Sequence, residues 1–304
     1  MRLVFFGTPT PAVPVLHALH DAGHDVALVV TQPERRRGRG GALIPSPVHA
    51  AARELDVPVR TPDRAREVAD ELASLDLEAG VVVAFGQLLP DAVLGAVPGG
   101  LVNLHLSRLP RWRGAAPVER AILAGDHETG VSVMRIDAGL DTGPVFNVVR
   151  TPIGDDETGG ELTDRLVALG TPALLDVLGA LPGLEPEDQR GEPTYAEKLR
   201  VDEFRLDPSD PADHLARVVR AGNPRPGAWL VADAKRVKVL RAHAVPGDES
   251  HASPPYELRW PGATLQTAAG GLVLDEVQVE GRRPMTADAW LAGSGRRRGS
   301  VPIS

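Results

Sequence analysis

The sequence of 304 residues contains no cysteine, which excludes disulfide bonds, thiolate metal sites and a cysteine nucleophile. It has no apolar run close to the roughly 20 residues that a membrane-spanning helix needs. The amino-terminal segment lacks the cleavage region of a secretory signal. These absences lead us to expect a cytoplasmic protein that does not contact a membrane.

Two further absences limit the chemistry. The nine histidines are scattered, without a metal-binding pair such as His-Glu-x-x-His, so we expect no metal ion. The segment Gly7-Thr8-Pro9 follows the first apolar run but matches neither the dinucleotide-binding pattern Gly-x-Gly-x-x-Gly nor a Walker phosphate-binding loop. The sequence therefore gives no support for NAD or ATP as a ligand.

The composition is that of a globular protein, with 42% hydrophobic and 24% charged residues. The net charge is −8, but it is unevenly spread. Residues 1–206 hold 30 acidic and 20 basic side chains, and residues 207–304 hold 11 and 13. A mildly basic C-terminal part is compatible with contact to a polyanion, although ordinary scatter also produces so small a difference.

The first two thirds of the chain alternate short apolar runs with amphipathic stretches. Strands are predicted at 2–6, 26–31, 80–85, 101–106, 131–136 and 145–150. Helices are predicted at 10–22, 47–55, 63–74, 115–124 and 161–180, the last broken at Gly170 and Pro172. This alternation is typical of an α/β fold with a Rossmann-like, mostly parallel sheet flanked by helices.

The pattern changes after residue 182. Residues 183–206 are rich in proline, glycine and acidic residues and are predicted to form a connector, followed by a helix at 211–221. Short strands are predicted at 229–231, 236–242, 256–260, 263–267 and 272–279, which together indicate a small β-barrel. We therefore expect domains at 1–182 and 207–304, with about the last ten residues loosely ordered.

Asn103 and His105 are the most informative residues of the predicted sheet. Side chains two apart on a strand point to the same face, and a buried parallel strand is normally apolar on both faces. Ligands of open α/β sheets bind at the carboxyl ends of strands, where His can exchange protons and Asn can donate to a developing oxyanion. The pair thus suggests acyl-type chemistry, whereas a structural His beside a turn-forming Asn is the plainer alternative.

Two loops could complete such a site. The strand that ends at Phe85 runs into Gly86, Gln87 and Leu88, and an apolar loop there could hold a flat aromatic ligand or simply connect strand to helix. The glycine-rich segment 137–144 indicates a turn. Either Asp137 or Asp141 could reach His105 from that turn, and the spacing does not choose between them.

Residues 31–41 are predicted to form a mobile, arginine-rich loop. Its basic residues are Arg35, Arg36, Arg37 and Arg39. Arginines on a flexible loop suit contact with nucleic acid phosphates, although a solvated run of charges is the commoner explanation.

Taken in order along the chain, these motifs resemble the methionyl-tRNA formyltransferase family, whose members use 10-formyltetrahydrofolate. The matching segments are Gly7-Thr8-Pro9, Thr31-Gln32-Pro33, Pro45-Ser46-Pro47-Val48, Asn103-x-His105, Ser107 to Pro110, Arg111 to Pro117, Gly125-Asp126, Thr129 to Val131, Asp137 to Gly143 and Thr194 to Lys198. The likeness covers nearly the whole chain, including a β-rich tail where the family has an OB-like domain. Leu106 and Arg108 depart from residues common in the family, and they leave the catalytic set intact.

The resemblance implies formyl transfer from 10-formyltetrahydrofolate to the α-amine of initiator methionyl-tRNA. It assigns Asn103 and protonated His105 as oxyanion donors, with Asp141 as the partner of His105 that assists removal of the amine's proton. It implies a folate site formed by Phe85, Gly86, Gln87, Leu88, Ser107, Arg108, Leu109 and Pro110. It also implies tRNA contact through Arg35, Arg36, Arg37 and Arg39, Arg39 foremost, and through the tail domain.

Three alternatives stay open at this point. A formyltransferase acting on a small amine, such as an amino sugar nucleotide or glycinamide ribonucleotide, would need neither the arginine loop nor the tail domain. A formyltetrahydrofolate hydrolase would use water in place of the amine, and an RNA-binding protein on the same scaffold would not need Asn103, His105 and Asp141. A monomer is plausible, but the sequence does not give the oligomeric state, the basis of initiator selection or any preference for folate polyglutamates.

Overall fold

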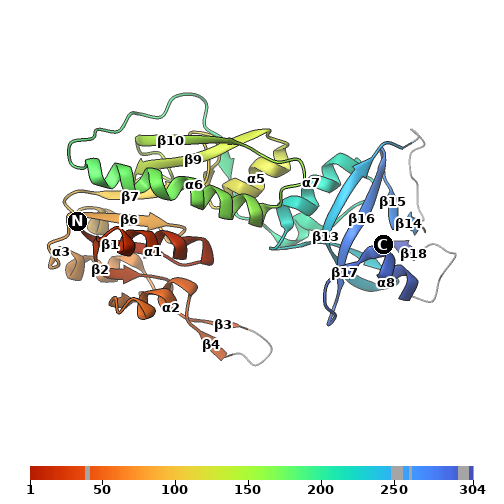
Figure 1. Ribbon diagram of the computed structural model, residues 1–304, viewed down its shortest axis with the longest axis horizontal. Coiled ribbons are helices and arrows are strands. Elements are labelled where there is room, and N and C mark those ends of the chain that lie inside the picture. The colour runs from red at the N-terminus through yellow and green to blue at the C-terminus, as the bar shows by residue number, and fades with distance from the viewer. Residues whose placement is uncertain (38–41, 248–255, 260–261, 294–300, 304) are drawn as a thin grey trace. The chain divides into compact units, whose positions relative to one another are not determined.

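The structure, a computed structural model, describes residues 1–37, 42–247, 256–259, 262–293 and 301–303 (Figure 1). The chain forms two compact units. The first consists of Met1–Pro117, Glu128–Pro152 and Thr163–Glu197. The second consists of Val118–His127, Ile153–Leu162 and Lys198–Ser304. Among the described residues, no helix is both long and apolar enough to cross a membrane.

A seven-stranded sheet forms the centre of the first unit. Its strands are β1 (Arg2–Gly7), β2 (Asp25–Val30), β5 (Val59–Arg60), β6 (Ala79–Val83), β7 (Leu101–His105), β9 (Glu128–Arg135) and β10 (Val145–Pro152), in the order β10-β9-β7-β6-β1-β2-β5. The five strands from β7 to β5 pair in parallel, whereas β9 pairs antiparallel with both of its neighbours, β7 and β10. The predicted mostly parallel α/β sheet is therefore confirmed.

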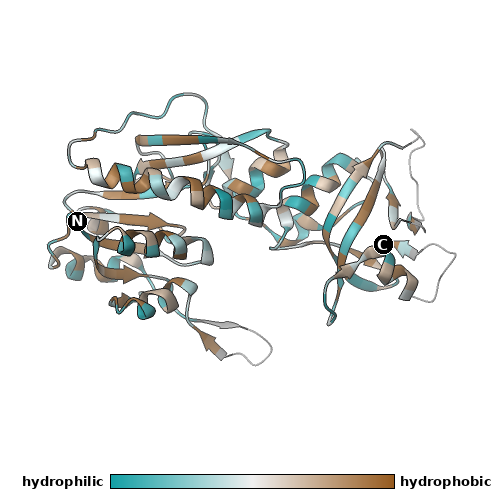
Figure 2. Ribbon diagram, viewed as in Figure 1, coloured by the Kyte–Doolittle hydropathy of each residue, from teal (hydrophilic) through white to brown (hydrophobic). Residues whose placement is uncertain are grey.

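Helical segments cover both faces of this sheet. They include η1 (Thr10–Ala12), α1 (Val13–Asp21), α2 (Pro47–Glu54), η2 (Ala65–Val68), α3 (Ala69–Ala73), α4 (Asp91–Leu94) and α6 (Gly159–Ala180), while α5 (Pro117–Ala124) belongs almost wholly to the second unit. On one face, Val4, Phe6 and Val82 pack with Leu72 of α3 and Val93 of α4. Figure 2 shows the inner strands largely brown and the helices mixed in colour, as amphipathic helices on a buried sheet require.

The predicted break in the last helix of this unit is wrong, because α6 continues through Gly170 and Pro172. Gly170 faces the sheet. A Cβ atom there would lie 2.6 Å from Cγ1 of Val131 and 2.9 Å from Cδ1 of Leu104. The glycine thus permits close packing of helix on strand, and this packing outweighs the hydrogen bond that Pro172 cannot donate.

Part of the predicted arginine-rich loop is a strand. Arg35–Arg37 form β3, which pairs antiparallel with β4 (Ala42–Ile44) as a short hairpin. Arg39 lies outside the described residues. The hairpin leads into α2, where the Ser46 hydroxyl accepts a hydrogen bond from the His49 N–H and Pro47 occupies the first turn. The Pro-Ser-Pro motif is therefore a helix start.

The second unit contains the predicted barrel. Its elements are η3 (Val201–Phe204), α7 (Ala212–Gly222), β12 (Ala228–Ala232), β13 (Lys235–Val245), β14 (Tyr256–Arg259), β15 (Thr264–Gln266), β16 (Gly271–Val279), β17 (Met285–Thr286), α8 (Ala287–Gly293) and β18 (Val301–Ile303). The order β13-β12-β18-β14-β15-β16 closes because β13 also pairs with β16, which gives a six-stranded antiparallel barrel.

The carboxyl terminus corrects another expectation. Residues 301–303 are not loosely ordered, because they form β18, which pairs with both β12 and β14 and completes the barrel. Ile303 is buried at 7% exposure. The arginines at 296–298 lie outside the described residues.

Candidate functional site at the carboxyl edge of the sheet

Asn103 and His105 continue one face of the buried sheet to its carboxyl edge. Leu101, Asn103 and His105 alternate with Val102 and Leu104, and Leu101 belongs to the apolar core of that face. Asn103 is 9% exposed and His105 6%. Two polar side chains therefore replace apolar ones where the core meets the sheet edge.

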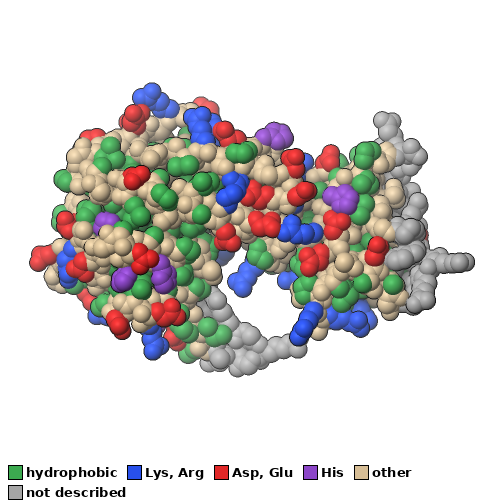
Figure 3. All heavy atoms as spheres, in the orientation of Figure 1, with side chains coloured by type: hydrophobic (Ala, Val, Ile, Leu, Met, Phe, Trp, Pro, Cys, Tyr) green, Lys and Arg blue, Asp and Glu red, His purple; other side chains and the backbone are tan. Residues whose placement is uncertain are grey.

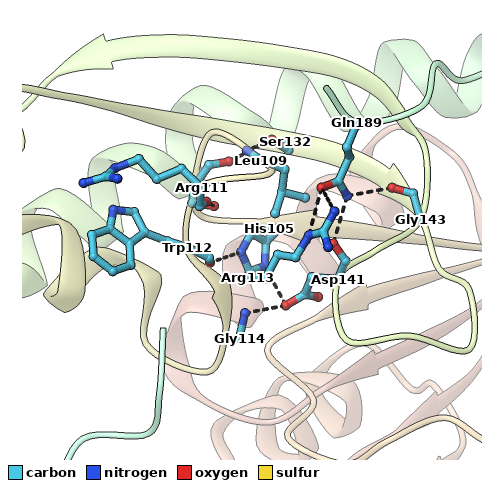
Figure 4. Close-up of polar contacts among 11 residues, drawn as sticks. His105, Leu109, Arg111, Trp112, Arg113, Gly114, Ser132, Asp141, Gly143 and Gln189 are labelled. Carbon is cyan, nitrogen blue, oxygen red and sulfur yellow. Dashed lines mark hydrogen bonds and ion pairs between the residues drawn. The ribbon is translucent and has the colours of Figure 1, made fainter. Parts of the chain in front are cut away.

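The ring of His105 is oriented through both of its nitrogens (Figure 4). Its Nε2 lies 2.9 Å from the carbonyl oxygen of Trp112, and because a carbonyl can only accept, Nε2 carries a hydrogen in this contact. Its Nδ1 lies 3.6 Å from Oδ2 of Asp141. This fixes the ring and leaves Nδ1, in the longer contact, as the nitrogen available for chemistry.

Asp141 is the aspartate that faces His105. Its side chain is 17% exposed, and Oδ2 accepts a hydrogen bond of 2.7 Å from the Gly114 N–H. Asp137 has another task, since its Oδ1 accepts from the Gly139 N–H at 3.0 Å and from the Thr142 hydroxyl at 2.6 Å. The structure thus separates two aspartates that the sequence could not, one beside the imidazole and one that shapes the turn.

The side-chain amide of Asn103 forms no hydrogen bond with any residue that the structure describes. Its strand neighbours are Val82 on β6 and Met134 on β9, which offer only apolar side chains. Its amide atoms are not among the fully buried, unpartnered side-chain atoms of the described residues, so they are accessible at the sheet edge. A ligand oxygen that reaches this edge can therefore take up their hydrogen-bonding capacity.

The loop after β6 lies at the same edge, because β6 and β1 run parallel to β7 and their carboxyl ends meet there. The carbonyl oxygen of Phe85 accepts from the Thr8 hydroxyl and the Gln32 amide, both at 2.9 Å. The Gln87 amide is engaged with the Ala65 N–H and the Pro62 carbonyl. Leu88, by contrast, is 78% exposed and presents an apolar surface at this edge.

The loop after β7, residues 107–111, is held in place by the hydroxyl groups of Ser107 and Ser132. Ser107 is fully buried, and its hydroxyl donates to the Arg111 carbonyl at 2.6 Å, so this side chain shapes the loop. Ser132 on β9 donates to the Ser107 carbonyl at 2.8 Å and accepts from the Leu109 N–H at 3.1 Å. Arg108 points to Glu128 in an ion pair, and Leu109 and Pro110 are joined by a cis peptide bond.

Of the predicted tRNA-contacting arginines, Arg35, Arg36 and Arg37 lie on β3, and Arg39 lies outside the described residues. On the barrel unit, Arg236 and Lys238 of β13 alternate with buried Val237 and Val239, so they occupy outward positions. Figure 3 shows basic and acidic side chains on the face of this unit that it presents, so the basic excess is not one uniform patch there.

Sequence reasoning missed several residues that hold the site. The Trp112 carbonyl and the Gly114 N–H are backbone groups, which side-chain patterns do not reveal. Gln189 was assigned to a connector, yet its amide contacts the backbone of Asp141 and Gly143. The one available signal was the family-like segment Thr194 to Lys198. Its Tyr195–Ala196 form β11, paired with β8 (Arg113–Gly114).

Comparison with known proteins decides the family. The formyl transferase family matches residues 1–178, and the formyl transferase C-terminal domain matches residues 198–295. The chain belongs to the formyl transferase family. As a formyl transferase, it has Asn103, His105 and Asp141 within the amino-terminal match, whereas the barrel strands β12 to β16 fall within the carboxyl-terminal one.

Curated relatives resemble this formyl transferase over nearly their full length. A protein of Cereibacter sphaeroides named methionyl-tRNA formyltransferase is 46% identical over 296 residues, 96% of each chain. One of Thermus thermophilus with the same name is 47% identical over 297 residues, 97% of each chain.

Among solved structures, HypX from Aquifex aeolicus in complex with tetrahydrofolic acid has the same fold, with a TM-score of 0.65 and 18% identity. The match covers 98% of this chain and 48% of HypX, so the chain spans about half of that protein.

Proposed function

We propose that this formyl transferase moves the formyl group of 10-formyltetrahydrofolate to the α-amine of initiator methionyl-tRNA. The observation that carries the proposal is the unpaired Asn103 amide beside the His105–Asp141 pair. Identity of 46% to a relative named methionyl-tRNA formyltransferase supports the choice of acceptor. The tetrahydrofolic acid in the HypX structure supports the choice of donor class.

The residues at the sheet edge fit a flat, partly apolar donor. The loop from Phe85 to Leu88 offers exposed apolar surface at Leu88 and a rigid backbone held through the Phe85 carbonyl. The loop from Ser107 to Pro110 is fixed from below by Ser132. Because Ser107 is fully buried and Gln87 is engaged, we assign the direct contacts to Leu88, the Leu109–Pro110 backbone and exposed Gly86, with Phe85, Ser107 and Arg108 shaping the loops.

The Asn103 amide would stabilise the reaction's developing negative charge. When the amine attacks the formyl carbon, the formyl oxygen gains charge, and a side-chain N–H on a buried strand, without another partner among the described residues, is well suited to donate to it. No described residue competes for that N–H. A new C–N bond forms to the methionine amine while the bond to N10 of the folate breaks.

His105 and Asp141 would manage the protons. One proton leaves the attacking amine and one arrives at N10, so the reaction balances without a further reactant. Nδ1 of His105 can donate toward the formyl oxygen, because Nε2 is committed to the Trp112 carbonyl. Asp141 lies 3.6 Å from that nitrogen and can orient an N–H there, and its Oδ1, to which no described residue donates, can accept the amine's proton.

The body of the tRNA would be bound at surfaces other than the one that holds its reactive amine. We propose that Arg35, Arg36 and Arg37, together with Arg39, contact phosphates of the tRNA from the β3–β4 hairpin. The outward Arg236 and Lys238 of the barrel would follow the backbone elsewhere. We further propose that residues 183–206 connect the two domains and that the protein acts as a monomer. We also propose that it works in the cytoplasm, where initiator tRNA is used.

The acceptor can be tested by competition. Purified protein and 10-formyltetrahydrofolate are incubated with methionyl-tRNA, an amino sugar nucleotide or glycinamide ribonucleotide, and each formylated product is measured. We expect formyl-methionyl-tRNA and little of the others, with initiator preferred to elongator tRNA. Faster formylation of a small amine would overturn the proposed acceptor, and tRNA-independent release of formate would indicate a hydrolase.

A further inference from the structure

We propose that Gln189 is a positioning residue that sets the geometry of the His105–Asp141 pair. The inference rests on the function proposed above, because Asp141 matters only if that pair takes part in the reaction. Gln189 lies between α6 and β11, in a stretch whose composition suggested a plain connector. Its side chain instead reaches the turn that carries Asp141 (Figure 4).

Gln189 uses both ends of its amide. Its Nε2 donates to the carbonyl oxygens of Asp141 and Gly143, each at 2.8 Å. Its Oε1 accepts from Nε and Nη2 of Arg113, at 3.1 Å and 2.7 Å. A glutamine amide can donate two hydrogen bonds and accept two, so these four contacts use its full capacity.

The contacts join two segments that each hold part of the site. Arg113 stands between Trp112, whose carbonyl fixes Nε2 of His105, and Gly114, whose N–H fixes Oδ2 of Asp141. Asp141 has a φ of 53°, in the left-handed region that few residues other than glycine adopt. Hydrogen bonds from Gln189 to the carbonyls of Asp141 and Gly143 stabilise that turn. Gln189 thereby links the placement of the carboxylate to that of the imidazole.

The backbone on either side of Gln189 is itself anchored. Glu187 exchanges two backbone hydrogen bonds with Val145 of β10, at 2.7 Å and 2.9 Å. On the other side, Thr194 accepts from the Trp112 N–H through its hydroxyl and from the Arg113 N–H through its carbonyl, both at 2.9 Å. The backbone that carries Gln189 is therefore held by the fold on both sides, as the backbone of a positioning residue must be.

The chemistry of the amide gives a specific variant. Gln189→Glu keeps the shape and the acceptor for Arg113 but cannot donate to the two carbonyls when ionised. Gln189→Leu removes both functions. We expect kcat to fall roughly 10- to 100-fold in each, because a displacement of about 1 Å at a reacting group can cost 10²-fold. The KM for folate and for tRNA should change less than threefold, since the amide of Gln189 uses its hydrogen-bonding capacity on Arg113, Asp141 and Gly143.

A matched control lies next to it on the same segment. Arg190 has a side chain that is 87% exposed, and its one ion pair among the described residues is with the exposed Glu187, at 3.8 Å. Arg190→Ala should leave kcat within twofold of the wild type. Circular dichroism and thermal unfolding check that every variant is folded.

Three measurements separate positioning from general damage to the fold. The pH profile of kcat should shift in Gln189→Glu. In an Asp141→Asn background, Gln189→Leu should cost less than threefold, because the residue acts through Asp141. The imidazole signal of His105 in NMR, recorded without substrate, should move in Gln189→Leu but not in Arg190→Ala.

The result that would overturn the inference is wild-type kcat and an unmoved His105 signal in folded Gln189→Leu. A full additional loss in the Asp141→Asn background would also contradict it, because Gln189 would then act elsewhere. Failure of the proposed function looks different: the wild type itself would not formylate methionyl-tRNA. In that case the NMR comparison still reports whether Gln189 orients the pair.

Discussion

At the residue scale, the site shows how backbone groups give side chains their roles. The Trp112 carbonyl engages Nε2 of His105 and the Gly114 N–H engages Oδ2 of Asp141. These contacts decide which nitrogen and which oxygen remain for the reaction. The sequence could identify the residue types, but the backbone partners depend on a loop conformation in which Trp112 adopts a φ of 63°.

The two aspartates of the 137–143 turn provide a matched test of this assignment. Asp141→Asn should lower kcat about 10²- to 10⁴-fold, because it removes the charge beside His105 and a proton acceptor. Asp137→Asn should retain near-wild-type kcat, because an amide oxygen can still accept from Gly139 and Thr142. Steady-state formylation assays measure both. Equal losses in the two variants would remove the special role of Asp141.

At the scale of elements, α6 shows packing overriding local preference. Gly170→Ala would improve helix propensity, yet its Cβ would lie within 3 Å of Val131 and Leu104. We expect a net loss of about 1–3 kcal/mol in the free energy of unfolding, the usual cost of overpacking. Urea denaturation followed by circular dichroism measures this change.

Gly179, near the end of the same helix, is the control. A Cβ there would meet nothing within 4 Å, and the residue is exposed. Gly179→Ala should therefore stabilise the protein by about 0.5–1 kcal/mol. Stabilisation by both substitutions would show that Gly170 is not needed for close packing.

The start of α6 predicts a dependence of stability on pH. The Thr158 N–H and hydroxyl both donate to Glu161, whose pKa these hydrogen bonds, the backbone one foremost, hold below its ordinary value. The unfolded state then binds the proton more tightly than the folded state. The stabilisation from Glu161 is therefore fully present above the ordinary glutamate pKa and is lost as the pH falls through the lowered one.

The variant Glu161→Gln tests this sign. Its free energy of unfolding should lie below that of the wild type at neutral pH, and the two should converge in acid below the ordinary glutamate range. Urea denaturation at a series of pH values gives the difference. A gap that stays constant with pH, or grows in acid, would contradict the assignment.

Most elements could be predicted from the sequence because their signals are local. The alternation of Leu101 to His105 gave a strand with its two polar residues on one face, and the burial of that strand agrees. The terminal strand β18 and the hairpin strand β3 were missed because each is three residues long and depends on pairing with a distant or short partner. The contacts of Gln189 were invisible because they span 46 and 48 residues.

At the scale of the whole molecule, the acceptor must be recognised well beyond its reactive amine. Replacing Arg35, Arg36, Arg37 and Arg39 by Ala should raise the KM for tRNA and weaken its dependence on salt, because fewer counterions are released on binding. Folate affinity should be unchanged. The slope of log affinity against log salt concentration measures the first effect, and equilibrium folate titration the second.

A loss of folate affinity that matches the loss for tRNA would mean that the hairpin supports the sheet edge. An unchanged salt slope would mean that other basic groups, such as Arg236 and Lys238 on the barrel, carry the electrostatic contact. Either result would remove the role assigned to the hairpin.

The unpaired amide of Asn103 at the sheet edge is proposed to stabilise the charge formed during formyl transfer. This role is tested most directly by the single-turnover rate of formyl transfer to initiator methionyl-tRNA, measured for the wild type and Asn103→Ala with both substrates saturating. We predict a rate about 10²- to 10³-fold lower in a folded Asn103→Ala protein, the usual cost of losing an oxyanion donor. A folded Asn103→Ala protein that transfers the formyl group at the wild-type rate would show that this amide does not stabilise the charge.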